Sequence, residues 1–188
     1  MSRGAAHAKL WGMGWSFKLH GGIAAGLSAL LLILAALTWL PGTLPLADST
    51  WLTAVVVVLV FPICTAALLR IILTRADRHT IWLSFRCLPG AVQGALAGLS
   101  VSGVVVLVVS MAGAGNLQSA ETRDGRYFVL DATPYKRGRI EVSRSEYLAV
   151  LESDQRSMLA IPSLLFASAA CLALAAGELG RANAEPGA

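Results

Sequence analysis

Residues Leu88 to Ala114 read LPGAVQGALAGLSVSGVVVLVVSMAGA, and this stretch of 27 residues contains no charged side chain. It is too long for an ordinary buried helix of a soluble protein, whereas a membrane-spanning helix needs about 20 apolar residues. The stretch is therefore predicted to cross a lipid bilayer with room to tilt. Working outward from it, the whole chain is interpreted as a multi-pass membrane protein.

The first half of this stretch has a small residue at every fourth position: Gly90, Gly94, Gly98 and Ser102. Residues four apart lie on one stripe of an α-helix, and in membranes such a stripe lets a second helix approach closely. These four residues are predicted to be helix-packing positions, as are Gly22 and Gly26 near the start of the chain. Their partner is predicted to be another helix of this chain or of a second membrane protein.

The composition is typical of a chain that faces lipid. Of its 188 residues, 56% are hydrophobic and 14% are charged, against about 25% charged in soluble domains. The net charge of +4 does not indicate a nucleic-acid partner, because the basic residues flank the apolar stretches and no nucleic-acid-binding module is present. Arginine outnumbers lysine 12 to 3, a bias that suggests a GC-rich bacterial genome.

Four apolar segments predict four transmembrane helices and hence an all-α membrane protein. Their approximate ranges are 21–40, 51–73, 88–114 and 158–177. The first is longer than the apolar region of a signal peptide, and Pro45-Leu46-Ala47 is a poor cleavage site, so an uncleaved span is favoured.

Two prolines lie inside these spans. Pro62 in the second and Pro162 in the fourth each remove a backbone hydrogen bond, which predicts a kink. At Pro62 the kink would be either a packing feature or a gating hinge. Both readings remain open at the level of the sequence.

Basic residues predict the orientation of the chain. The N-terminal segment 1–20 and the loop 70–86 together carry seven lysines or arginines, whereas the turn 41–50 carries none. Segment 1–20 is either an interfacial anchor or a frayed tail. Both it and the tail 178–188 are predicted to lie on the cytoplasmic side of a bacterial inner membrane, which places residues 116–157 outside.

The segment 116–157 is predicted to hold a small extracytoplasmic β-hairpin between the third and fourth spans. Arg126–Asp131 (RYFVLD) is rich in strand-favouring residues, and Gly138–Val142 (GRIEV) alternates between polar and apolar ones. Pro134 lies in the connection between them. A lone hairpin is marginal in water, so it is expected to pack on a neighbouring helix or on the membrane surface.

A helix is predicted to follow the hairpin. Ser143-Arg-Ser-Glu146 matches a capping box, in which the serine side chain accepts from the backbone of Glu146 and the glutamate accepts from the backbone of Ser143. No helix breaker precedes Pro162. The helix is therefore expected to run as a stalk through residue 157 into the fourth span.

Residues 124–157 carry a pattern that resembles small bacterial multi-pass membrane proteins of unknown function. The pattern consists of Asp124-Gly125-Arg126-Tyr127, Ile140-Glu141-Val142-Ser143, Glu146-Tyr147 and Gln155-Arg156. That family often has Asn-His-Gly in the hairpin turn, where this chain has Thr133-Pro134-Tyr135-Lys136. The resemblance implies a membrane protein and supplies no catalytic residue.

No catalytic, cofactor or metal site is predicted. His7, His20 and His79 have no metal-ligand spacing, and no Walker, Gly-x-Ser-x-Gly or zincin motif is present. The spans contain no charged residue near their centres, where ion-coupled carriers usually need one. At the inner end of the fourth span, Glu178 is expected either to pair with Arg70 or Arg86 or to remain a solvated tail carboxylate.

The leading hypothesis is a non-enzymatic packing or interaction protein whose partners are the lipid bilayer and another membrane protein or a second copy of itself. An accessory subunit of a transport or export complex is the first alternative. A small membrane enzyme acting on lipids is the second, and its candidate acid–base groups are Asp124, Asp131, Glu141 and Glu146.

Overall fold

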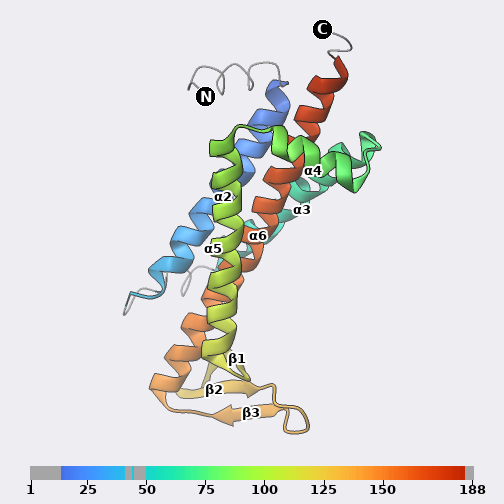
Figure 1. Ribbon diagram of the computed structural model, residues 1–188. Helices are drawn as coiled ribbons and strands as arrows, with labels where there is room; N and C mark the ends of the chain where they lie inside the picture. The colour runs from blue at the N-terminus through green and yellow to red at the C-terminus, as the bar shows by residue number, and fades with distance from the viewer. Residues whose placement is uncertain (1–13, 41–43, 45–49, 185–188) are drawn as a thin grey trace.

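A computed structural model describes residues 14–40, 44 and 50–184 of the chain (Figure 1). The described elements are α2 (Trp15–Leu37), α3 (Thr50–Leu73), α4 (Arg78–Cys87), α5 (Gly90–Ala114), β1 (Leu117–Arg123), β2 (Arg126–Asp131), β3 (Gly138–Glu141) and α6 (Arg144–Ala184). Of these, α2, α3, α5 and α6 are long and apolar enough to span a membrane, as predicted. The predictions made for residues 1–13, for most of the turn 41–50 and for residues 185–188 lie outside the described part.

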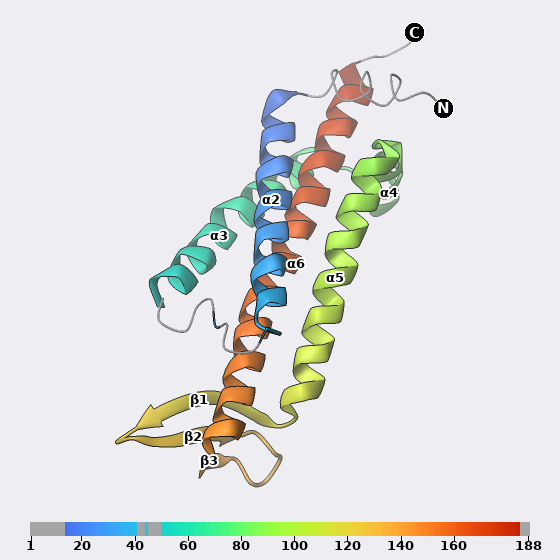
Figure 2. The same cartoon turned by 90° about the vertical axis from the view of Figure 1, so that its left-hand side faces the viewer.

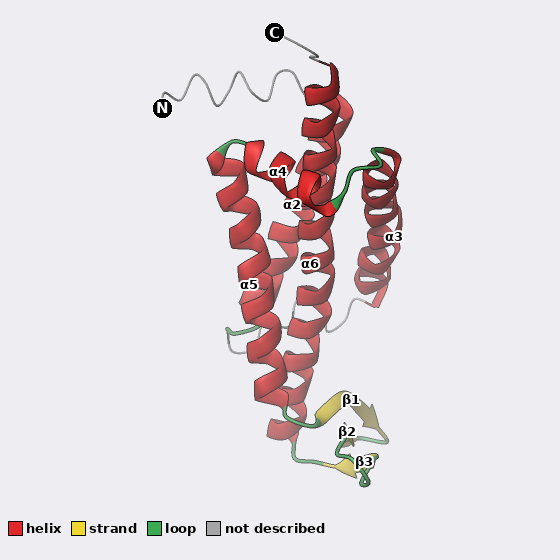
Figure 3. Cartoon of the chain, turned by 45° about the vertical axis from the view of Figure 1, so that its right-hand side comes forward, coloured by secondary structure: helices red, strands yellow, loops and turns green. Residues whose placement is uncertain are grey.

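Helix α6 is the element around which the others pack. Its 41 residues make it about 60 Å long at 1.5 Å per residue, twice the thickness of a bilayer core. Helices α2, α3 and α5 all contact it, with α3 and α5 on opposite sides (Figures 2 and 3). The charged outer turns and the apolar span form one continuous helix, as the absence of a breaker predicts.

The face that α6 presents to its neighbours is largely alanine. Its buried residues include Ala160, Ala167, Ala169, Ala170, Ala173, Ala175 and Ala176. Small side chains allow neighbouring helix backbones to approach closely in a membrane. Larger side chains, above all Leu159 and Phe166, fill the space toward α2 and α5 near the middle of the helix.

Two glycines receive leucine side chains of α6. A Cβ atom added at Gly103 of α5 would lie 2.7 Å from Cδ2 of Leu164, and one added at Gly21 of α2 would lie 2.6 Å from Cγ of Leu174. These distances are far shorter than van der Waals contact, so only glycine fits at either position. Gly21 and Gly103 therefore allow the close helix contacts within this chain.

The predicted packing positions are not used for contacts inside the chain. A Cβ atom added at Gly22, Gly26, Gly90, Gly94 or Gly98 meets nothing within 4 Å. Ser102 is likewise exposed. As a prediction of packing between helices of this chain, the stripe was wrong. Packing of the same face against a second protein stays a prediction.

The orientation of α5 explains this result. Leu96 and Gly103 are buried and seven residues apart, which puts them on the same side of the helix, toward α6. Gly94 and Gly98 each lie two residues from Leu96, which is about 160° around the axis at roughly 100° per residue. The stripe therefore faces away from α6, although Gly103 lies only one residue beyond Ser102.

The predicted loop 70–86 contains a short helix, which corrects the interpretation of this segment as a plain connection. Asp77 is the N-cap of α4: its side chain accepts a hydrogen bond of 3.0 Å from the backbone N–H of Thr80. Helix α4 contacts α6 and lies at the end of the molecule where α2 begins and α6 ends (Figure 3). Its exposed Trp82, stacked on Phe85, fits a helix lying in a membrane interface.

The ends of the spans also differ from the prediction. Helix α2 begins at Trp15 and ends at Leu37 rather than covering 21–40, so part of the predicted interfacial segment is helical. Phe17 lies under the guanidinium of Arg70, which also donates hydrogen bonds to Ser16. These contacts tie the first turn of α2 to the last turn of α3. Helices α3 and α6 both continue through their prolines, and a bend at either position stays a prediction.

The outer polar segment is a three-stranded antiparallel sheet with the order β1-β2-β3, not a two-stranded hairpin. The predicted strands are β2 and β3. The missed strand, Leu117–Arg123, reads LQSAETR and has no aromatic residue and only one β-branched residue, Thr122, so its composition does not mark a strand. The feature of the sequence that indicates this strand is the Asp124-Gly125 turn that follows it. Asp124 and Gly125 both have positive φ, 51° and 75°, as an Asp-Gly hairpin turn requires.

The sheet is attached to the start of α6. Both hydrogen bonds predicted for the capping box are present: Oε2 of Glu146 accepts from the N–H of Ser143 at 3.0 Å, and Oγ of Ser143 accepts from the N–H of Glu146 at 3.3 Å. The rings of Tyr127 and Tyr147 lie 4.9 Å apart between β2 and α6. The third strand and these contacts supply the packing that a lone hairpin lacks.

Glu178 neither pairs with Arg70 or Arg86 nor remains a solvated carboxylate, since it is buried and 4% exposed, so both expectations were wrong. Its carboxylate accepts hydrogen bonds from Arg181, three residues later on the same helix. Arg181 thereby places a positive charge in the last turn of α6, where the helix dipole favours it. Arg181 lies about one helical turn from Glu178, so the ion pair forms within α6 and needs no residue of another helix.

Candidate functional site

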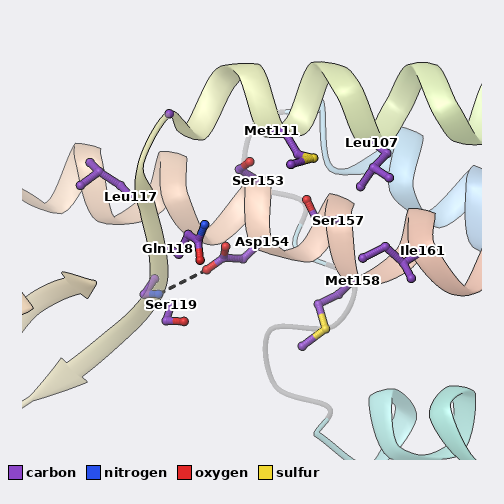
Figure 4. A pocket seen from close by; sticks show the side chains of 12 residues that line it. Leu107, Met111, Leu117, Gln118, Ser119, Ser153, Asp154, Ser157, Met158 and Ile161 are labelled. Atoms are coloured by element: carbon purple, nitrogen blue, oxygen red, sulfur yellow. Dashed lines mark hydrogen bonds between the residues drawn. The ribbon is translucent and has the colours of Figure 1, made fainter. Parts of the chain in front are cut away.

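A cavity lies where the sheet meets the helices. It has a volume of about 460 Å³ and is enclosed by the end of α5, the beginning of β1 and one face of α6 (Figure 4). Its lining residues are Leu107, Met111, Gly115, Leu117, Gln118, Ser119, Ala120, Ser153, Asp154, Ser157, Met158 and Ile161. The volume falls within the range of ordinary small-molecule sites.

One face of α6 forms the wall of this cavity and changes character along its length. Asp154, Ser157, Met158 and Ile161 are spaced three and four residues apart, so they project on the same side of the helix. The first two are polar and the last two are apolar and exposed. The cavity therefore runs from a polar end beside β1 to an apolar end beside the membrane-spanning part of α6.

A β-bulge in β1 shapes the polar end. The register between β1 and β2 shifts between Gln118 and Glu121, and Ser119 has a φ of 54°, a conformation that a residue other than glycine rarely adopts. The bulge directs the backbone N–H of Ala120 at Oδ2 of Asp154, at 3.3 Å (Figure 4). Bulges re-aim backbone and side chains at functional sites in many proteins.

A hydrogen bond from the same helix closes the back of the cavity. Ser153 is buried, and its hydroxyl donates to the backbone carbonyl of Ser110 in α5 at 2.7 Å. The hydroxyl of Ser110 in turn donates to the carbonyl of Val106. The bond from Ser153 to Ser110 joins α6 to the end of α5 at the level of Asp154, and so holds the two helical walls of the cavity together.

Asp154 differs from the other acidic residues that the structure describes. Four of those pair with arginine: Glu121 with Arg139, Glu141 with Arg126, Glu152 with Arg156, and Glu178 with Arg181. Three others accept hydrogen bonds that cap a helix or turn, namely Asp77, Asp131 and Glu146. Asp124 is exposed in the β1–β2 turn. Asp131 and Asp154 are both partly buried without an ion pair, but Asp131 accepts from both the N–H and the hydroxyl of Thr133, whereas Asp154 accepts from the backbone of β1.

The capping carboxylates and Asp154 respond to their surroundings in opposite directions. The hydroxyl and N–H of Thr133 lower the pKa of Asp131, and the N–H and hydroxyl of Ser143 lower the pKa of Glu146. Burial raises the pKa of Asp154, while the N–H groups of Ala120 and Ser119 act in the opposite direction. The ionised form of Asp154 is therefore costly in the folded protein, and the described side chains do not offset that cost.

The residues that the sequence singled out lie elsewhere. The glycines of α2 and α5 face away from the cavity or lie on other faces, the capping box is at the start of α6, and Pro62 is on α3. The carboxylates Asp124, Asp131, Glu141 and Glu146 belong to the sheet and the cap, and none lines the cavity. Asp154 was missed because nothing in its neighbours along the chain marks it. Its setting is created by β1, 34 residues earlier.

Comparison of the chain with protein-family models, with curated proteins and with solved structures finds no match. The resemblance of residues 124–157 to small bacterial membrane proteins stays a prediction. The class that the fold defines is a mostly helical protein with four helices able to span a membrane and a small antiparallel sheet at one end.

We expect Asp154→Asn to raise the unfolding temperature of the detergent-solubilised protein at about pH 8. A carboxyl group whose pKa is higher in the folded than in the unfolded protein supports folding below its unfolded pKa, and this contribution is lost as the pH rises through the folded pKa. Asparagine can still accept from Ala120 but carries no charge to desolvate. The advantage of the variant should therefore shrink as the pH is lowered toward about 4.

Thermal unfolding followed by circular dichroism across that pH range tests this expectation. Asp124→Asn is the matched control, because it removes a carboxylate from the exposed turn, where asparagine tolerates positive φ. It should leave the unfolding temperature nearly unchanged at every pH. An Asp154→Asn variant that is less stable than the wild type at high pH would show that the carboxylate contributes stability rather than costing it.

Proposed function

We propose that this chain is a non-enzymatic integral membrane protein of a bacterial cytoplasmic membrane that assembles with a second copy of itself through the outer face of α5. The observation that carries the proposal is the open face formed by Gly94, Gly98 and Ser102. Lipid chains pack poorly into a flat glycine surface, whereas a second helix gains close backbone contact there. The same chain uses Gly21 and Gly103 in this way against α6.

The arrangement of helices supports the proposal. The inner face of α5 is occupied by α6, and α3 lies on the far side of α6 (Figure 3). Among the described helices, none covers the outer face of α5. A second α5 helix would cross this face at short distance, because two small-residue stripes that are related by a two-fold axis are complementary to each other.

The orientation belongs to the same proposal. The beginning of α2, the helix α4 and the end of α6 lie at one end of the molecule, and the sheet lies at the other (Figure 1). Basic residues near the first end, including Lys18, Arg70 and Arg86, favour the cytoplasmic side for it. The sheet and the outer turns of α6 are then extracytoplasmic.

Cysteine crosslinking in native membranes tests the assembly. In a variant with Cys64, Cys87 and Cys171 replaced by alanine, Ser102→Cys substitutes a residue of nearly equal size on the outer face of α5. Mild oxidation should give a disulfide-linked dimer. Ser168→Cys, an equally conservative change at an exposed position of α6, is the control for random collision and should remain monomeric.

Adding Gly98→Leu to the Ser102→Cys variant should abolish the dimer, because the leucine side chain separates the two helices. A heavier adduct of Ser102→Cys containing another protein would instead favour the accessory-subunit alternative. If Ser102→Cys forms no crosslink beyond the level of Ser168→Cys, the outer face of α5 has no protein partner and the proposal fails.

The arrangement of the outer carboxylates gives no support to the lipid-enzyme alternative. Asp131 and Glu146 accept local capping hydrogen bonds, and Glu141 pairs with Arg126 at 3.5 Å. They lie on different elements and do not line a common cavity. A general acid or base must lie within hydrogen-bond reach of a bound substrate.

A further inference from the structure

We infer that the cavity between α5, β1 and α6 is a binding site for a long-chain amphiphile with a protonated amine head group, held by the carboxylate of Asp154. The two ends of the cavity differ in polarity, as the two ends of such a molecule do. Its polar end is formed by Asp154, Ser157 and Gln118, and its apolar end by Met158 and Ile161 (Figure 4). This inference is independent of the proposed assembly, which concerns the opposite side of α5.

The position of the cavity along α6 fits a ligand that lies partly in the membrane. After Arg156, α6 carries no charged residue until Glu178, and the largely apolar stretch begins at Met158. Asp154 therefore lies just outside the membrane-spanning part, while Ile161 lies inside it. The two residues are seven apart, or about 10 Å along the helix axis, so one molecule can place its head group at Asp154 and its alkyl chain against Ile161.

The charge of the cavity selects the head group. The lining contains one carboxylate and no lysine, arginine or histidine. An anionic or phosphate head group would find no cation there and would be repelled by Asp154. An ammonium group would offset the cost of the half-buried charge, because a desolvated carboxylate is stabilised by a hydrogen-bonded cation.

The geometry leaves a place for that ammonium group. The carboxylate is fixed on one side by the N–H of Ala120 at 3.3 Å, which takes only part of its hydrogen-bonding capacity, since an ionised carboxylate has two acceptor oxygens. The remaining capacity is available to an ammonium group that enters the cavity, and the hydroxyl of Ser157 lines the same cavity as a further acceptor. A neutral alcohol head group would gain the hydrogen bonds but not the charge pairing.

Perturbed ionisable groups that lie in a cleft cluster at functional sites. The other described acidic residues pair with arginine, accept capping hydrogen bonds or, for Asp124, are exposed, whereas Asp154 is half-buried in the lining of the cavity and forms no ion pair. The bulge adds a second cost, because it holds Ser119 at positive φ. Both costs are concentrated at the polar end of one cavity.

Photoaffinity labelling of the full chain in phosphatidylcholine nanodiscs tests the inference. The probe is a long-chain primary amine that carries a diazirine on its alkyl chain, and the comparison probes are the alcohol and the carboxylic acid of equal chain length. Peptide mapping should find the amine probe attached near Met111, Met158 and Ile161. Labelling of Val58 on α3, which is 65% exposed, measures simple partitioning into the lipid.

Asp154→Asn should reduce labelling of the cavity by the amine probe by about ten-fold, the effect of losing roughly one charge-assisted hydrogen bond. Labelling at Val58 should not change. Asp124→Asn should behave as the wild type, because it removes one negative charge from the same outer segment without touching the cavity. Ile161→Trp, which fills the apolar end and leaves Asp154 intact, should also reduce labelling of the cavity.

Three results would overturn the inference. The first is equal labelling of the cavity in the wild type and Asp154→Asn proteins. The second is equal labelling by the alcohol and amine probes, which would assign a neutral amphiphile. The third is amine labelling only at exposed positions away from the cavity, such as Val58. Because the crosslinking of Ser102→Cys is measured separately, failure here leaves the proposed assembly untouched.

Discussion

Replacement of Phe166 by alanine is expected to lower the free energy of unfolding by at least about 2 kcal/mol. Phe166 is 1% exposed and packs among Leu31, Val106 and Leu159, where α2 and α5 meet α6. In soluble proteins such a change costs about 3–5 kcal/mol, of which part is the transfer of the ring from water. That part is absent when the unfolded reference lies in lipid, and the cavity and the lost dispersion contacts remain.

Phe61→Ala is the matched control for this prediction. Phe61 lies on α3 and is 70% exposed. Its ring therefore makes few contacts with the rest of the chain, and its removal leaves no enclosed cavity. Unfolding by sodium dodecyl sulfate in mixed micelles, followed by circular dichroism, measures both variants. The Phe61→Ala protein should stay within about 0.5 kcal/mol of the wild type. Equal losses for the two variants would contradict the central position assigned to α6.

Leucine at Gly103 and leucine at Gly98 are expected to have opposite effects on the stability of the monomer. At Gly103 a Cβ atom alone would lie 2.7 Å from Cδ2 and 2.9 Å from Cγ of Leu164, so α5 must move away from α6. Overpacking of this kind costs about 1–3 kcal/mol, and the better helix propensity of leucine returns less than about 1 kcal/mol. At Gly98 the space is open, and only the gain in propensity applies.

Thermal unfolding in a detergent that keeps the protein monomeric measures the two effects without the influence of assembly. Gly103→Leu should unfold several degrees below the wild type, since about 1 kcal/mol corresponds to roughly 2–4 °C for a chain of this size. Gly98→Leu should unfold at the wild-type temperature or slightly above it. A loss of stability in Gly98→Leu monomers would mean that the stripe packs within the chain after all.

The same pair of variants connects stability with the proposed assembly. Gly98→Leu is expected to be a stable monomer that no longer forms the Ser102→Cys crosslink, whereas Gly103→Leu should lose stability first and the crosslink only as a consequence. A residue that serves a contact between chains and a residue that serves a contact within the chain are thereby distinguished. They lie five positions apart on one helix.

The number of helices long and apolar enough to span a membrane was determined by the sequence alone. A helix in lipid must satisfy every backbone hydrogen bond within itself, so an uncharged run such as Leu88–Ala114 becomes a helix whatever surrounds it. The capping box at Ser143 and Glu146 and the continuous stalk of α6 were equally predictable, because their interactions connect residues only three or four apart. The Asp-Gly turn at 124–125 carried the same kind of local signal for β1.

Which faces meet was decided only by the tertiary structure. In the sequence, Gly98 and Gly103 are both glycines of one apolar helix and nothing distinguishes them. Only the position of α6 makes Gly103 a contact residue and leaves Gly98 open. In the sequence, Asp154 looks like an ordinary polar residue. Its half-buried setting arises only because the bulge of β1, 34 residues earlier, packs against it in the folded chain. Contacts between helices in a membrane depend on shape and not on the burial of apolar surface from water, and shape exists only once the helices are assembled.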